Sequence, residues 1–309
     1  MQLMDLNKRK DFIDSIDKGT INEEVISQAT GGPIVMLSLF NDLQNPLFKQ
    51  HNFDVSEFLS GVRPALERFH SVSGLLEQQF EKTLSEAMNS STAGNRGSTV
   101  DASSTDESIA YIEKDVMQEV VMQHRWKDAA EKDPESLAGQ LSRMMTTELL
   151  DLHQESALIA FSSFHANRII KFNEGSFTVN NAALISARAF LCAEKAPTED
   201  IEGWGERSES KYELIDYNLD ESELKKRKGG VAAQLEVLYD VSHEFVETIP
   251  APGKKDEPNG KGRELKVDTS FVAVAVLEGW LSGGPDDQLR WKISLYRPAF
   301  EFPHLQEGI

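Results

Sequence analysis

Residues 267–281 read VDTSFVAVAVLEGWL, a run that becomes apolar on both sides of an extended chain toward its end. Successive side chains of a β-strand point to opposite faces of the sheet. One face would carry Val272, Val274 and Val276, and the opposite face Ala273, Ala275 and Leu277. A strand with one face in water alternates apolar and polar residues instead, so this pattern predicts a central strand covered on both faces.

The stretches before and after this run alternate in the manner of half-buried strands. One face of the first stretch is formed by Ala233, Leu235, Val237, Tyr239, Val241, His243 and Phe245. In the second stretch Leu289, Trp291, Ile293 and Leu295 are expected to share one face. The connections are too short for crossover helices, which predicts an antiparallel meander with its core strands between Val231 and Arg297.

The first half of the chain has helical periodicity. Asp54 is placed as an N-cap, with Glu57 three residues later as its capping-box partner. Apolar positions follow at helical spacing: Phe58, Val62, Leu66, Phe69, Leu76, Phe80 and Leu84. Pro64 interrupts this run, so it predicts either one kinked helix or, as we prefer, two pieces that share an apolar face.

Further helices are predicted before the period changes to two. One begins at Thr105 and runs to His124; another begins at Asp133-Pro134-Glu135, and its apolar face runs from Leu137 to Leu152. It either continues or restarts through residues 157–164. After Asn167 a hairpin is expected, with its turn at residues 173–176. Residues 183–193 are interpreted as a strand, with a short helix as the alternative.

These patterns predict an α+β fold in which N-terminal helices pack on a curved antiparallel sheet. The predicted organisation is an N-terminal helical arm at 1–90, a flexible linker at 91–105 and an α+β domain at 106–309. The linker is predicted because it holds almost nothing to bury. Charged insertions are expected near 197–230 and 249–264.

Charge excludes some function classes. The formal net charge is −19, whereas nucleic-acid binders carry basic patches that displace counterions from phosphates. The one basic run, at residues 225–228, follows three acids and is interpreted as the end of a short helix. No run approaches the roughly 20 apolar residues of a membrane span. A single cysteine, Cys192, allows no internal disulfide and indicates a reducing compartment.

Patterns of catalytic residues are incomplete. His153-Gln154-Glu155 has the H-x-E form of zinc deaminases, but the Cys-x-x-Cys partner is missing, so a polar helix face is expected. Asp240 and His243 are three apart on one strand and would point to opposite faces. His243 is expected to be a half-buried or core imidazole, and Cys192 a packing residue. No catalytic residue, metal or cofactor is therefore predicted.

Aromatic side chains are the candidate binding residues. They are Tyr239, Phe271, Trp280, Trp291, Phe300 and Phe302. The strand aromatics are expected either to form ordinary sheet core or to line an apolar hollow between sheet and helices. The tail with Phe300 and Phe302 either folds back over its own domain or offers anchors to a partner.

The order of elements resembles a known family. A helix led in by Asp133-Pro134-Glu135-Ser136-Leu137 precedes a strand pair and long strands that end in Leu289-Arg290-Trp291-Lys292. Over residues 106–297 this layout resembles the Tim44-like domain family, which includes a mitochondrial import subunit and a mitochondrial ribosome receptor. The resemblance implies an NTF2-like cone and a non-enzymatic role beside the inner mitochondrial membrane.

Two functions from different classes follow. The first is a scaffold or adaptor that binds a protein partner, in mitochondria and with peripheral membrane association if the resemblance holds. The sequence alone shows no presequence and indicates the cytoplasm. The alternative is an NTF2-like small-molecule-binding protein or enzyme that uses the pocket between sheet and helices. Direct membrane binding through the helix at 54–88 is disfavoured because that helix lacks a basic face.

Overall fold

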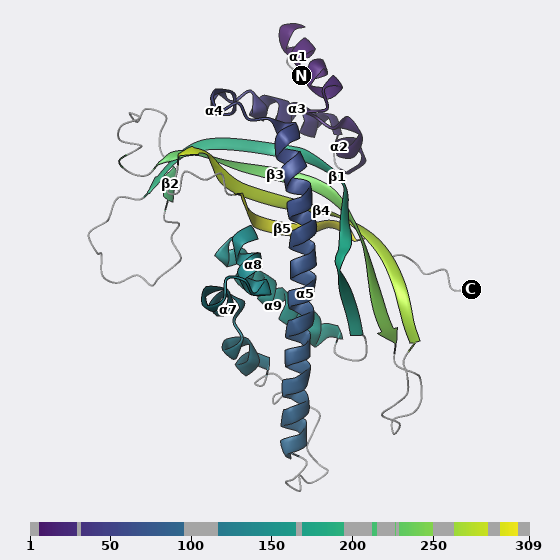
Figure 1. The fold of residues 1–309 in the computed structure, drawn as a ribbon. Helices are drawn as coiled ribbons and strands as arrows, with labels where there is room; N and C mark the ends of the chain where they lie inside the picture. Colours follow the sequence, from purple (N-terminus) through teal and green to yellow (C-terminus); the bar gives the residue numbers. More distant parts are fainter. Residues whose placement is uncertain are drawn as a thin grey trace. The chain divides into compact units, whose positions relative to one another are not determined.

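The computed structural model describes residues 6–29, 32–95, 117–164, 169–194, 212–214, 226, 229–249, 263–283 and 291–301. Its helices are α1 (Leu6–Asp17), α2 (Glu23–Ala29), α3 (Gly32–Leu43), α4 (Pro46–Gln50), α5 (Val55–Asn95), α7 (Trp126–Lys132), α8 (Leu137–Met144) and α9 (Thr147–Phe164). Its strands are β1 (Ile169–Glu194), β2 (Tyr212–Leu214), β3 (Gly230–Ile249), β4 (Arg263–Gly283) and β5 (Lys292–Glu301). The α+β prediction is confirmed (Figure 1).

The chain divides into two compact units. Unit 1 comprises Met1–Pro64, Val179–Val241 and Phe271–Phe302. Unit 2 comprises Ala65–Thr178, Ser242–Ser270 and Pro303–Ile309. Residues 96–116 lie outside the described part, as do most of the predicted insertions, so the linker at 96–105 stays a prediction. Residues 91–95, however, continue α5 as helix, which corrects the first part of the predicted linker at 91–105.

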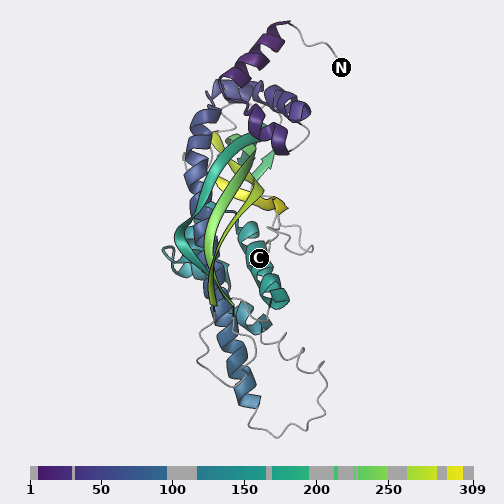
Figure 2. The same cartoon turned by 90° about the vertical axis from the view of Figure 1, so that its right-hand side faces the viewer.

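The strands form one sheet in the order β2-β1-β3-β4-β5, which both ribbon views follow (Figures 1 and 2). Strand β4 lies between β3 and β5, and every residue from Ala273 to Leu277 is buried. Consecutive burial means that both faces of β4 are covered, as predicted. In β3 the predicted inner face is confirmed from Ala233 to Val241, where alternate side chains are buried.

Strand β5 departs from the prediction at two bulges. Ile293 pairs with Leu277, but Leu295 pairs with Val276, so Ser294 is an extra residue in the ladder. Because Leu277 and Val276 point to opposite faces, their partners Ile293 and Leu295 do so too, and the prediction of one shared face was wrong. Ile293 is buried, whereas Leu295 is exposed. The strand also continues past Pro298 to Glu301. A proline is tolerated there because β5 is an edge strand.

Strand β1 replaces the predicted hairpin. Residues 169–194 form one continuous strand, so the expected turn at 173–176 was wrong, and the strand interpretation of 183–193 was correct. Asn173-Glu174-Gly175-Ser176 is a weak turn signal compared with Asn-Gly. The neighbouring strand β3 is 20 residues long and offers hydrogen-bonding groups to an extended β1.

Helix α5 runs without a break through Pro64, so the preferred division into two pieces was wrong. The Asp54 cap is confirmed, because the Glu57 N–H donates to Asp54 Oδ1 at 2.9 Å. Buried apolar side chains precede and follow the proline, among them Val62 and Leu66. Their packing on one face holds the helix together although the proline removes a backbone hydrogen bond.

In unit 2, α8 begins later than predicted. Ser136 is its N-cap and accepts from the Gly139 N–H, while Asp133 accepts from the Glu135 N–H in the preceding turn. The chain breaks at Met145, inside the predicted helix, so the prediction of one apolar face from Leu137 to Leu152 on a single helix was wrong. Helix α9 then runs unbroken to Phe164, which agrees with the alternative of continuation through residues 157–164. Helix α7 was not predicted, and of the predicted helix at 105–124 the structure describes helical residues 117–123.

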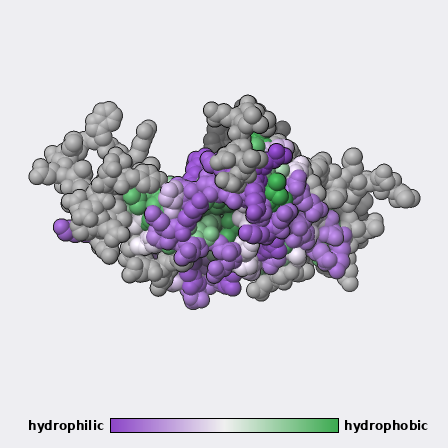
Figure 3. Space-filling model, turned by 90° about the horizontal axis from the view of Figure 1, so that it is seen from above, coloured by the Kyte–Doolittle hydropathy of each residue, from purple (hydrophilic) through white to green (hydrophobic). Residues whose placement is uncertain are grey.

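In unit 1 the N-terminal helices pack against the sheet. The rings of Phe58 and Trp291 have their centroids 5.0 Å apart, and Asn45 Nδ2 donates to the Ala189 carbonyl at 3.4 Å. The coloured residues on the face shown in Figure 3 are mostly hydrophilic, with smaller hydrophobic areas between the polar ones. Among the helices that the structure describes, none combines the length and the apolarity needed to cross a bilayer.

Candidate functional site

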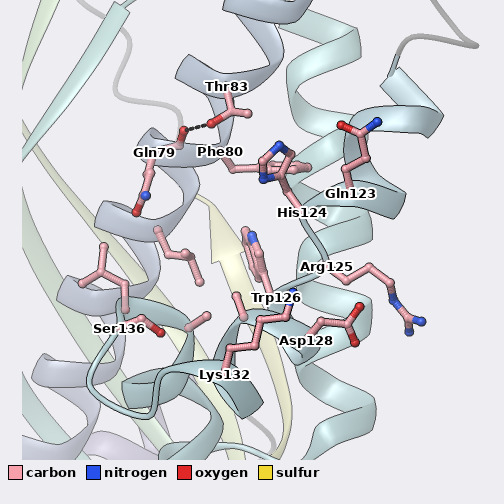
Figure 4. A pocket seen from close by; sticks show the side chains of 14 residues that line it. Gln79, Phe80, Thr83, Gln123, His124, Arg125, Trp126, Asp128, Lys132 and Ser136 are labelled. Carbon is pink, nitrogen blue, oxygen red and sulfur yellow. Dashed lines mark hydrogen bonds between the residues drawn. The ribbon is translucent and has the colours of Figure 1, made fainter.

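Unit 2 contains a half-open groove between α5, α7 and α8, with a volume of about 270 Å³ (Figure 4). Three segments line it. From α5 come Leu76, Gln79, Phe80 and Thr83; from 123–132 come Gln123, His124, Arg125, Trp126, Asp128, Ala129 and Lys132; from the start of α8 come Ser136, Leu137 and Ala138.

The floor of the groove is aromatic and aliphatic. Phe80 and Trp126 meet edge to face, with ring centroids 5.6 Å apart and planes at 76°. Both rings are buried, as is Leu76 one helical turn before Phe80. Helix α5 presents Leu76 and Phe80 together because residues four apart share a helix face. Figure 4 shows the Trp126 ring beneath the Phe80 ring, inside the groove.

A buried glutamine fixes the position of Trp126. Gln154 of α9 accepts from the Trp126 N–H through Oε1 and donates to the His124 carbonyl through Nε2, both at 2.9 Å. One side-chain amide thus satisfies the backbone on both sides of Arg125, at the point where α7 begins. His153-Gln154-Glu155 was expected to be a polar helix face; Gln154 differs from its exposed neighbour Glu155 in being buried.

The rim of the groove is polar and carries both signs of charge. Arg125, Asp128 and Lys132 are exposed, and Arg125 lies 3.8 Å from Asp151 of α9 in a solvent-exposed ion pair. Exposed pairs of this kind contribute little stability. The groove consequently combines an apolar floor with charged edges, which suits an amphipathic segment better than a purely apolar ligand.

Beside the floor lies a hydrogen-bonded triplet of Ser73, Glu77 and His153. Glu77 Oε1 is 3.0 Å from His153 Nε2, Ser73 Oγ bonds the same Nε2, and Ser73 donates to Glu77 at 3.1 Å. A catalytic triad needs the acid on one imidazole nitrogen and the nucleophile on the other. With both groups on Nε2, the nitrogen that faces the carboxylate as a donor cannot also accept the serine proton.

Two further histidines lie in a stack of rings. Phe177 stacks on His70 at 5.6 Å and on His243 at 4.8 Å, and His243 stacks on Phe245 at 5.3 Å. Burial, and then charge repulsion from the nearby His243 and His153, lower the pKa of His70 to about 3. Burial also lowers the pKa of His243, against an opposing effect of Asp268. The half-buried His243 matches its prediction.

The predicted aromatic site residues do not form one site. Tyr239 is 0% exposed, and burial, then the neighbouring Tyr296, raise its pKa well above the ordinary value. Trp291 packs on Phe58, and Phe271 and Trp280 are half-buried. Phe300 pairs with Val272 through the backbone of β5, whereas its side chain and all of Phe302 lie outside the described residues.

The remaining predicted candidates have structural partners. Asp240 accepts from both the backbone N–H and the side-chain amide of Asn181, at 2.8 and 2.9 Å. Cys192 is buried, and burial, then Glu278, raise the pKa of its thiol. Within the described ranges, no group of three or more His, Cys, Asp or Glu side chains could hold a metal ion.

Sequence reasoning did not single out the groove residues. Phe80 was assigned to the apolar face of a helix, and Trp126 was not considered because the predicted helix ended at His124. The sequence did carry a signal for the start of α7. Trp126 is followed by Asp128, an acidic residue in the first turn of that helix. A scan against protein-family models finds no match, and a search of curated proteins returns no relative.

Proposed function

We propose that this protein is a non-enzymatic adaptor whose groove between α5, α7 and α8 receives an amphipathic helix of a protein partner. The observation that carries the proposal is the groove itself, with its buried Phe80–Trp126 floor and charged rim. Grooves between helices are a recurring site for amphipathic helices, whose apolar residues serve as anchors.

The size of the groove favours a protein partner over a small molecule. Pockets for drug-sized ligands and cofactors measure roughly 300–1,000 Å³ and enclose most of the ligand. This groove, at about 270 Å³, lies at the small end of that range, and because it is half open it would not enclose most of such a ligand. Such a site holds a few anchoring side chains while the rest of the partner stays outside.

The Ser73–Glu77–His153 triplet supports the non-enzymatic part of the proposal. Both the carboxylate and the hydroxyl meet the same imidazole nitrogen, an arrangement in which the imidazole cannot serve as the base of a serine triad. Elsewhere in unit 2 the ring of Phe177 stacks on both His70 and His243. Packing and hydrogen bonding therefore account for the burial of these polar side chains.

The resemblance to Tim44-like domains adds a location to the proposal, beside the inner mitochondrial membrane. Its test is the fractionation of cells that express the chain with a C-terminal tag. Recovery of the tagged chain in the mitochondrial fraction would support the resemblance. Recovery in the cytosolic fraction alone would contradict the mitochondrial location. The groove proposal would remain, because it rests on unit 2 alone.

Site-specific photocrosslinking tests the groove. A photoreactive phenylalanine is placed at Gln79, which lines the groove, and separately at Ser85, an exposed position on the same helix that does not line it. We expect a defined protein adduct from position 79 and none from position 85. Ala129→Phe, which fills the groove, should abolish the adduct, while Ala65→Phe on the exposed face of α5 should leave it intact.

Two results would contradict the proposal. One is equal crosslinking from positions 79 and 85, which would mean that the groove is not the contact surface. The other is an adduct that survives Ala129→Phe in a protein whose circular dichroism is unchanged. A small molecule that co-purifies with the chain and is lost in Ala129→Phe would instead support the alternative function.

A further inference from the structure

The outward side of α9 carries two large apolar side chains in one row. Leu152 is 57% exposed and Ile159 is 64% exposed. They are seven residues apart, which on an α-helix is close to two full turns, so both lie on the same stripe. Single exposed apolar residues are common, and the turn between these two carries Glu155 and Ser156, so Leu152 and Ile159 form two separate apolar contact points on one stripe. An amphipathic helix contacts such points with anchoring side chains at matching helical spacing.

Acidic residues follow one side of this stripe. Glu148, Asp151 and Glu155 are spaced at i, i+3 and i+7, and at 100° per residue they fall on the same flank of Leu152 and Ile159. Glu148 and Glu155 are exposed, and Asp151 is half-buried beside Arg125. The opposite flank carries the small exposed residues Ser156 and Ala160, which allow another backbone to approach.

We propose that this outer face of α9 is a second docking surface, and that its occupant is a basic amphipathic helix of a protein partner. The partner's apolar residues would cover Leu152 and Ile159, and its Lys or Arg side chains would lie along the acidic flank. The charge of the flank agrees with the net charge of −19, which favours basic partners generally. An anionic membrane surface would be repelled by the same carboxylates.

This surface differs from the groove in position and in the charge it selects. The groove is formed by α5, α7 and α8, whereas the second surface is built from α9 residues that do not line the groove. Two surfaces would allow one chain to hold two partner segments at once. The inference does not depend on the groove being occupied.

The test measures binding of a fluorescent helical peptide to the full chain. The peptide has about 18 residues, enough for a marginally stable helix, with leucines on one face and lysines along one flank. Leu152→Ser with Ile159→Ser, and separately Glu148→Lys with Glu155→Lys, should each weaken binding by about tenfold or more. Matched controls are Ile34→Ser on α3, which removes an isoleucine that is 77% exposed, and Glu23→Lys with Glu24→Lys on α2.

Both controls should bind as the unmodified chain does, and raising the salt concentration should weaken binding. Equal affinity of all variants would overturn the proposal, because it would show that the acidic chain binds the peptide without using α9. Two further outcomes would overturn the choice of occupant. One is self-association in sedimentation experiments that Leu152→Ser with Ile159→Ser abolishes; the other is flotation with anionic vesicles that these substitutions prevent.

Discussion

His70 shows how burial changes the chemistry of a single side chain. It is 6% exposed, stacks on Phe177 and has its pKa lowered to about 3 by burial and by two neighbouring histidines. The folded protein therefore holds a neutral imidazole over a range in which the unfolded chain takes up a proton. Below the ordinary value of 6.5, protonation favours the unfolded state, so the folded state loses stability as pH falls.

We expect the free energy of unfolding to fall by about 2 kcal/mol from this one group between roughly pH 7.5 and pH 5. His70→Phe removes the titrating group and keeps a ring against Phe177, so its unfolding free energy should depend less on pH by that amount. Urea denaturation at both pH values measures the difference. The control is His124→Phe, at an exposed position, which should keep the pH dependence of the unmodified chain.

An unchanged pH dependence in His70→Phe would contradict the lowered pKa. It would mean that water or a hydrogen-bonding group stabilises the charged imidazole in the folded state. Burial also lowers the pKa of His243 in the same stack of rings, so residual pH dependence in the variant would be assigned to His243. Comparison of the two variants cancels the contribution of exposed carboxylates.

For single residues, the sequence predicted whether a side chain is buried better than it predicted which residues that side chain contacts. The alternation around Tyr239 and His243 correctly indicated a buried and a half-buried side chain. It could not show that Gln154 reaches the backbone of residues 124 and 126, because that contact joins segments 28 and 30 positions apart. The groove was missed for the same reason: its floor exists only where α5 meets α7.

Among the helices, two glycines make a matched pair. A Cβ at Gly139 in the first turn of α8 would lie 2.5 Å from the Asp133 carbonyl oxygen and from backbone atoms of Pro134. A Cβ at Gly61 in α5 would meet nothing within 4 Å. Glycine is unfavourable inside a helix in general, so only the close approach of the backbone explains its presence in α8.

Opposite effects on stability follow for the same substitution. Gly61→Ala should raise the free energy of unfolding by about 0.5–1 kcal/mol through helix propensity. Gly139→Ala should lower it by about 1–3 kcal/mol, because the turn before α8 must move to admit the methyl group. Urea denaturation followed by circular dichroism compares the two. If Gly139→Ala instead raises the free energy of unfolding, the backbone of Asp133 and Pro134 must leave room for a methyl group on α8.

The errors in predicting elements have a common physical origin. Pro64 and the Asn173–Ser176 segment are local signals for a break, and in both places the chain continues as one element. Packing of the apolar face of α5, and pairing of β1 with a long neighbour, outweigh a local preference worth a few kcal/mol. The bulge at Ser294 could not be predicted, because register belongs to a strand pair and not to one strand.

For the whole chain, the class of fold followed from the sequence but the division into units did not. Alternating and doubly apolar strands predicted an α+β fold with a covered central strand, which the burial of β4 confirms. Composition gave no sign that both compact units would combine early and late segments. Long-range contacts define such units, and periodicity reports only the neighbours of each residue along one element.

Four elements pass from one unit into the other. Helix α5 crosses the division at Pro64, and β1, β3 and β4 cross it at Thr178, Val241 and Ser270. Helical and sheet hydrogen bonds form cooperatively along an element. Opening one unit should therefore unwind the same helix and strands that the other unit needs, and we expect both units to open together.

Hydrogen exchange measured on the full chain tests this coupling. Gln154→Leu in unit 2 leaves the Trp126 N–H and the His124 carbonyl without their partner, which should cost about 2–3 kcal/mol. Amide protection should then fall by a similar free energy in α3 of unit 1 as in α7 and α9 of unit 2. Glu155→Ala, at the adjacent exposed position, should change protection in neither unit. If Gln154→Leu exposes the amides of unit 2 while α3 keeps its protection, the units open separately, and the continuous elements do not couple them.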